Sequence, residues 1–194
     1  MKTAELWEFD RAFGPSVAGM DEAGRGPLAG PVVCACCLPK TLIDGVNDSK
    51  KIAEKKRERL FESLISTEIY GVGIVDEKRI DEINILNATK EGMETAFKNM
   101  GTIPDIVLID AIKGLKFPCP DRAIVKGDAT SYAIAAASVI AKVTRDRIMR
   151  EYDKMYPQYG FAAHKGYGTA AHIAALKKYG PCPIHRRSFI GHFV

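Results

Sequence analysis

Apolar runs bounded by polar residues predict the strands of this chain. The runs at 17–20, 31–38 and 106–109 are nearly continuous and rich in β-branched residues, which is typical of strands buried on both faces. The segment 68–75 alternates between apolar and polar positions, and the short run 123–125 predicts a further strand. Several strands, some of them fully buried, indicate one sheet with its faces covered.

Helical spacing of apolar residues predicts the elements that cover that sheet. The pattern favours helices over residues 53–65, 86–100, 131–149 and 169–179. The helix over 131–149 is the longest and is rich in alanine, which permits close packing against a sheet. Strands mixed with helices predict an α/β or α+β fold.

Length and composition predict a single globular domain, 1–194. The chain has 194 residues, 46% of them hydrophobic and 27% charged, with no repeat, linker or run of the roughly 18 apolar residues that a membrane helix needs. The first ten residues are acidic and lack an apolar core, so we expect no secretory signal and a cytoplasmic protein. The five cysteines form no metal-binding or disulfide spacing, and three lie within 31–38, which favours buried thiols.

Charge is concentrated at the C-terminus. Residues 154–194 carry six Lys or Arg, no acid, all four histidines and seven of the sixteen aromatics. The net charge is +4, so the rest of the chain is net negative. A basic segment interleaved with aromatics suits a phosphate backbone with stacked bases or sugars, although a solvated basic end fits the charge equally well.

Four carboxylates follow predicted buried strands: Asp21, Glu22, Asp110 and Asp128. Ligands of open sheets bind beyond the carboxyl ends of the strands, where carboxylates from separate elements can converge on hard divalent cations. Each acid taken alone has a plainer interpretation: a solvated turn, a strand-end turn for Asp110, or a helix N-cap for Asp128.

A glycine-rich segment follows the first two acids, and we call residues 24–30 the glycine loop. Its glycines let the backbone approach a ligand, and Arg25 between them can bind a phosphate. The spacing is neither the dinucleotide fingerprint nor a P-loop, and a tight structural turn is an equal alternative on this segment alone.

The ordered motifs of the chain resemble ribonuclease HII. They are the run GMDEAGRGPLAGPV at 19–32, DSKK at 48–51, LID at 108–110, KGD at 126–128 with AAS and AKVTRD at 136–146, HKGYGT at 164–169 and HRRSF at 185–189. The resemblance covers about residues 17 to 189. It implies an α/β fold of the ribonuclease H type, a mixed β-sheet flanked by α-helices with additional C-terminal helices.

The resemblance also implies the activity and its residues. The enzyme would be a metal-dependent endonuclease that cuts the RNA strand of RNA–DNA hybrids and nicks 5′ of single ribonucleotides embedded in duplex DNA, leaving 3′-hydroxyl and 5′-phosphate ends. The catalytic and metal-binding residues would be Asp21, Glu22, Asp110 and Asp128, with Mg²⁺ or Mn²⁺ and two ions in the substrate complex. The substrate-binding residues would be Gly24, Arg25, Gly26, Ser49, Lys50, Lys51, Lys165 and Tyr167.

Specific roles follow from the same resemblance. The backbone of residues 24–26 would recognise the 2′-hydroxyl at the RNA–DNA junction, and Tyr167 would pack on the next sugar. Lys50 and Lys51 would lie near phosphates, and the C-terminal part from about 154 would bind the duplex. We expect a monomer with no membrane partner.

Two other functions remain open at this point. A nucleic-acid-binding module without catalysis would use the basic tail equally well, but four acids would repel its ligand unless cations intervened. A different nuclease of the same fold is the third possibility. We interpret Arg145 and Asp146 as a structural ion pair and His164 as lining the duplex or a loop, without catalytic roles.

Overall fold

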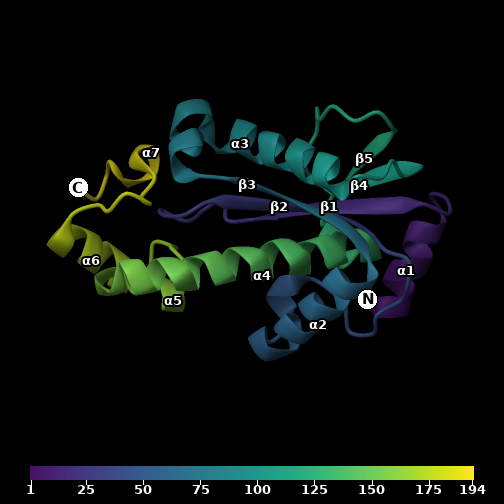
Figure 1. The fold of residues 1–194 in the computed structure, drawn as a ribbon, viewed down its shortest axis with the longest axis horizontal. Helices are drawn as coiled ribbons and strands as arrows, with labels where there is room; N and C mark the ends of the chain where they lie inside the picture. The colour runs from purple at the N-terminus through teal and green to yellow at the C-terminus, as the bar shows by residue number, and fades with distance from the viewer.

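A five-stranded mixed sheet forms the centre of the molecule (Figure 1). The computed structural model describes all residues, 1–194. The strands are β1 (Val17–Ala23), β2 (Val32–Leu38), β3 (Ile69–Val75), β4 (Ile106–Asp110) and β5 (Asp121–Ile124), in the order β3-β2-β1-β4-β5. β2 is antiparallel to β1 and β3, whereas β4 is parallel to β1 and β5. The mixed sheet expected from the sequence is confirmed.

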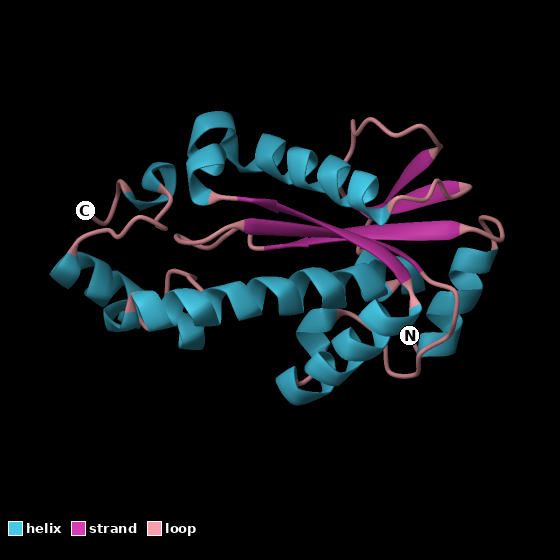
Figure 2. Cartoon of the chain, in the orientation of Figure 1, coloured by secondary structure: helices cyan, strands magenta, loops and turns pink.

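Helices cover both faces of this sheet (Figure 2). The α-helices are α1 (Thr3–Arg11), α2 (Glu54–Thr67), α3 (Glu77–Met100), α4 (Tyr132–Met155), α5 (Phe161–His164), α6 (Ala170–Tyr179) and α7 (Arg187–Ile190). Short 3-10 turns form η1 (Ser49–Lys51), η2 (Gly127–Ala129) and η3 (Pro157–Tyr159). α3 packs on one face, and α4 packs on the other together with α1 and α2.

The cysteines of β2 contribute to both cores. Cys34 and Cys36 face α3, whereas Cys37 faces α4, and all three are free and fully buried. Their interpretation as buried thiols is therefore confirmed.

Close approach of α4 to β1 requires glycine at position 19. A Cβ there would lie 2.1 Å from the backbone carbon of Ala133. This contact fixes the start of α4 against the strand that carries Asp21 and Glu22.

Some elements extend beyond the predicted ones. The predicted helix over 86–100 is the second stretch of α3, after the kink at Asn84. The first stretch was not predicted; it begins at Glu77, where Asp76 caps it by accepting a hydrogen bond from the Arg79 N–H (2.8 Å). The apolar pattern of α3 is broken at Asn84, which has φ 66° and ψ 162° and kinks the helix. α1 was not predicted at all, and α4 continues to Met155 beyond the predicted end at 149.

The C-terminal segments gather at one end of the molecule (Figure 1). Met149 at the far end of α4 packs with Ala29 of the glycine loop and with Phe161 and Ile184 of the tail. The tail also forms an isolated bridge between Ala29 and His185. No helix of the chain combines the length and hydropathy needed to cross a bilayer.

Candidate active site

Sheet topology brings the four acids to one edge. β1 and β4 are parallel with Met20 beside Ile109, so Asp21 and Asp110 occupy the next positions of neighbouring strands. Glu22 follows Asp21, and Asp128 lies in η2, just after β5. The Gly127 N–H donates to Asp110 Oδ1 at 2.8 Å, which ties η2 to the end of β4. Segments more than a hundred residues apart thus meet here.

Burial and nearby negative charge raise the pKa values of three of these acids, Asp21, Glu22 and Asp128. Asp21 is only 6% exposed, and burial, followed by the charges of Glu22, Asp110 and Asp128, raises its pKa well above its usual range. Burial also raises the pKa of Glu22, against the opposing effect of Arg25, and that of Asp128. Glu22 Oε2 is buried with no hydrogen-bond partner. A cation at this edge would compensate the buried negative charges and give the unpartnered Glu22 oxygen a partner.

The acids fit an open site for a hard divalent cation better than a closed cage. No three His, Cys, Asp or Glu side chains converge closely enough to hold an ion alone. One oxygen of Glu22 faces Arg25 (3.4 Å), and one oxygen of Asp128 faces Lys50 (3.6 Å). Mg²⁺ commonly uses one or two carboxylates, waters and substrate phosphates, so this arrangement suits an ion completed by a polyanionic substrate.

A cleft of about 430 Å³ opens beside these acids. Its lining includes Asp21, Glu22, Gly24, Arg25, Gly26, Ser49, Lys50 and Tyr167. Two of the four predicted catalytic acids and six of the eight predicted substrate-binding residues therefore share one cavity, and the ion pair with Lys50 joins Asp128 to it.

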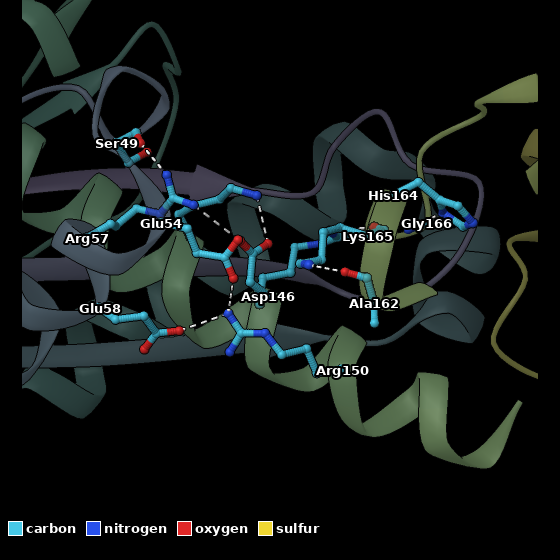
Figure 3. Close-up of polar contacts among 12 residues, drawn as sticks. Ser49, Glu54, Arg57, Glu58, Asp146, Arg150, Ala162, His164, Lys165 and Gly166 are labelled. Carbon is cyan, nitrogen blue, oxygen red and sulfur yellow. Dashed lines mark hydrogen bonds and ion pairs between the residues drawn. The ribbon is translucent and has the colours of Figure 1, made fainter. Parts of the chain in front are cut away.

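The two remaining substrate-binding candidates lie elsewhere. Lys51 lines a separate hollow and pairs with Asp48 (3.5 Å). Lys165 adopts a left-handed backbone conformation (φ 52°), and its ammonium donates to the Ala162 carbonyl (Figure 3). These placements give neither lysine a contact with the cleft, so their substrate roles stay predictions.

Two cationic side chains of the cleft were missed by the sequence reasoning. Arg57 of α2 and Lys142 of α4 line it. Asp146 pairs with Arg57 at 3.6 Å (Figure 3). Asp146 also pairs with Lys142, at 2.7 Å. The i,i+4 spacing of Lys142 and Asp146 could have indicated their pair. The expected ion pair between Arg145 and Asp146 is wrong, because Asp146 is engaged by these two cations instead. No local pattern pointed to Arg57.

His164 has a loop contact, as the sequence suggested. Its Nε2 lies 2.8 Å from the Tyr159 carbonyl, and its Nδ1 accepts from the Gly166 N–H (3.2 Å). Both ring nitrogens therefore have partners within the chain.

Comparison with known proteins identifies the family. The family model described as ribonuclease HII matches residues 18–192. This chain belongs to the ribonuclease HII family. The ribonuclease HII of Acetivibrio thermocellus is 61% identical over 181 residues, which cover 92% of this chain and 71% of that protein.

Solved ribonuclease H structures share the fold. The ribonuclease H2 of Pyrococcus horikoshii OT3 has a TM-score of 0.74 and 32% identity, with 90% of this chain and 93% of that chain covered. The ribonuclease HII of Archaeoglobus fulgidus, solved in a complex with PCNA, has a TM-score of 0.76 and 25% identity, with 91% and 96% covered.

Membership of the ribonuclease HII family makes the chain a ribonuclease H-type endoribonuclease, a hydrolase. The family is divalent-metal-dependent and acts on RNA–DNA substrates. The binding module without catalysis is thereby excluded, and the predicted ribonuclease H-like fold is confirmed.

Proposed function

We propose that this ribonuclease HII cuts the RNA strand of RNA–DNA hybrids and nicks duplex DNA on the 5′ side of a single embedded ribonucleotide. The observation that carries the proposal is the shared cleft, in which buried acids lie beside a glycine loop with free backbone donors. A nuclease that acts at one ribonucleotide must cleave and recognise within the length of about one nucleotide. The cleft brings the acids and the glycine loop together, which supports both functions at that range.

The four acids would hold Mg²⁺ or Mn²⁺, with two ions when substrate is bound. Such ions activate water and stabilise the leaving oxygen, which yields 3′-hydroxyl and 5′-phosphate ends. The raised pKa of Asp21, caused first by burial, and the unpartnered Glu22 Oε2 support this assignment. Lys50 would orient Asp128 and lie near a backbone phosphate.

The glycine loop would recognise the ribose. Arg25 and Gly26 have backbone N–H groups without a partner in the chain, whereas the Leu28 N–H is bonded to the Gly166 carbonyl (2.8 Å). A 2′-hydroxyl accepts hydrogen bonds and distinguishes RNA from DNA. Recognition through the backbone is independent of base sequence, as this reaction requires.

Tyr167 would pack on the neighbouring deoxyribose. Its side chain is 45% exposed, lines the cleft, and is the nearest neighbour of a Cβ built on Gly26, at 3.9 Å. The basic C-terminal part from about 154 would bind the duplex, because it carries no acid to repel phosphates. A single domain, a monomeric state and a cytoplasmic location stay predictions.

The test uses a 5′-labelled DNA duplex with one ribonucleotide, an all-DNA duplex and a long RNA–DNA hybrid, each with Mg²⁺, Mn²⁺ or EDTA. We expect a single nick 5′ of the ribonucleotide that is absent from the DNA duplex and from EDTA. Asp21→Asn and Asp110→Asn should abolish it while duplex binding persists. Asp44→Asn, at an exposed position outside the cleft, is the matched control.

The other outcomes have distinct meanings. Cleavage of the hybrid alone would remove the proposed junction role of residues 24–26 and of Tyr167. Full activity in either Asn variant would refute the role of that acid. Products unrelated to the ribonucleotide would indicate a different nuclease.

A further inference from the structure

Two arginines behind the glycine loop are buried without carboxylate partners. Arg145 of α4 is 1% exposed and Arg186 is 0% exposed, and neither forms an ion pair. Burial lowers the pKa of Arg145 to about 10 and that of Arg186 to about 9, where the charge of Arg145 adds to the effect. Arginine is almost never fully buried unless paired, so these two require an explanation.

Backbone carbonyls take the place of the missing carboxylates. Arg186 donates to the carbonyls of Gly24 (2.6 Å), Arg25 (2.9 Å) and Gly30 (2.9 Å). Arg145 donates to the carbonyls of Ala29 (3.1 Å), Pro31 (2.9 Å) and Lys165 (2.9 Å). Arg186 therefore holds both ends of the glycine loop. Arg145 holds only the C-terminal end of the loop and the segment that leads to Tyr167.

These bonds determine where the loop's N–H groups point. In a trans peptide the carbonyl and the N–H of the next residue point in opposite directions. The Gly24 and Arg25 carbonyls are turned to Arg186, so the N–H groups of Arg25 and Gly26 are turned away from it. Both residues line the cleft, and neither of their N–H groups has a partner in the chain. Because Arg186 holds the carbonyls of these two peptides, their N–H groups point away from it and are available to a ligand in the cleft.

We propose that Arg186, supported by Arg145, is a positioning residue that sets 2′-hydroxyl selectivity without touching the substrate. This inference rests on the proposed function. The buried cation behind each carbonyl also polarises the peptide, which makes the opposite N–H a better donor. The same loop without Arg186 could rotate these peptides and offer carbonyl oxygens to the ribose instead.

Glycine at position 24 is explained by the close approach of Arg145. Its φ is +100°, and a Cβ there would lie 2.1 Å from Arg145 Nε. The residue must therefore be glycine to admit the guanidinium, independently of any ligand on the other side.

The test compares Arg186→Met and Arg186→Lys with Arg187→Met. Arg187 is the adjacent arginine, exposed, and its contact with Asp81 (2.7 Å) uses the backbone N–H, which the substitution retains. Dissociation constants are measured for a DNA duplex with one ribonucleotide and for the all-DNA duplex, with Ca²⁺ in place of Mg²⁺. Selectivity is the dissociation constant for the all-DNA duplex divided by that for the ribonucleotide duplex.

We expect Arg186→Met to reduce this ratio by roughly tenfold, the equivalent of one to two hydrogen bonds, with DNA affinity changed less than about twofold. The ratio for Arg186→Lys should fall between those of Arg186→Met and the parent protein, because one ammonium can hold only part of the loop. Arg187→Met should keep the ratio of the parent protein, because loss of a basic side chain in the tail weakens binding to both duplexes equally. A folded Arg186→Met protein with unchanged selectivity would overturn the inference, as would an equal loss of affinity for both duplexes. A parent protein without selectivity would instead refute the proposed function.

A second measurement applies if Arg186→Met does not fold. In the parent protein, the amides of Arg25 and Gly26 should exchange with solvent without protection. The ribonucleotide duplex should protect them, and the DNA duplex should not. Protection in the free protein, or equal protection by both duplexes, would contradict the proposed orientation.

Discussion

Asp21→Asn should make the metal-free protein more stable while it abolishes cleavage. The pKa of Asp21 is raised in the folded state by burial and by the acids around it, so the folded protein binds this proton more tightly than the unfolded chain. The stability contributed by that proton is present at low pH and lost as pH rises through the folded pKa. Ionised Asp21 therefore opposes folding at neutral pH, and a neutral amide of the same shape removes the opposition.

The structure bounds the size of this effect. Asn can keep the local contact, because its amide oxygen can still accept the Glu22 N–H now held at 2.7 Å by Asp21 Oδ1. A buried polar group without a compensating partner costs about 1–3 kcal/mol, and a charged one more. We expect a gain of roughly 1–3 kcal/mol, or about 3–9 °C in Tm for a domain of this size.

Thermal unfolding at pH 8 in EDTA tests the prediction, with Asp44→Asn as the exposed control. Divalent ions should then raise the Tm of the parent protein by binding its folded state, and should raise the Tm of Asp21→Asn less. The difference in Tm between the variant and the parent should therefore become smaller. This difference should also shrink at acidic pH, where Asp21 is protonated. A variant that is no more stable than its parent in EDTA would refute the view that these charges are in conflict.

Further predictions concern the packing, the tail and the cleft. Gly19→Ala should cost about 3 kcal/mol or more, seen as a lower urea midpoint, because its Cβ would overlap the backbone of α4. The Nε2 atoms of His172 and His185 lie 3.0 Å apart. Burial lowers the pKa of both side chains, to about 4 for His185. The stability they contribute should be complete above about pH 6.5 and fall as pH drops toward 4, and His185→Gln should flatten that pH profile measured by urea unfolding. Lys50→Ala should reduce the salt slope of duplex binding by about one, measured by titration at several ionic strengths; an unchanged slope would place that lysine away from phosphates.

The sheet was predictable because its strands are apolar runs, and two of these runs are followed directly by carboxylates. β1 and β4 finish in Asp21–Glu22 and Asp110, so the acids could be located from the same pattern as the strands. Their convergence depends on strand order, which no local pattern encodes. The convergence of the acids was predicted from the ordered motifs that resemble ribonuclease HII.

Long-range contacts of charged side chains were not predictable. Arg145 follows a helical pattern and precedes an acid, so an ion pair was the natural expectation. The structure turns it to carbonyls at positions 29 and 31 instead. The turns of α3 before Asn84 were missed, whereas the predicted start at 86 lies where the Asn84 side chain accepts from the Leu86 and Asn87 N–H groups (3.0 and 3.1 Å).

The contact between Arg186 and the glycine loop has a consequence during synthesis. The loop and the first two acids leave the ribosome early, but Arg186 lies 162 residues beyond Gly24. The loop can reach its final shape only after the segment that carries Arg186 has emerged. A nascent chain that ends before this segment would carry the nuclease acids without the means to select a ribonucleotide. Emergence of that segment would then act as the step that makes this nuclease selective.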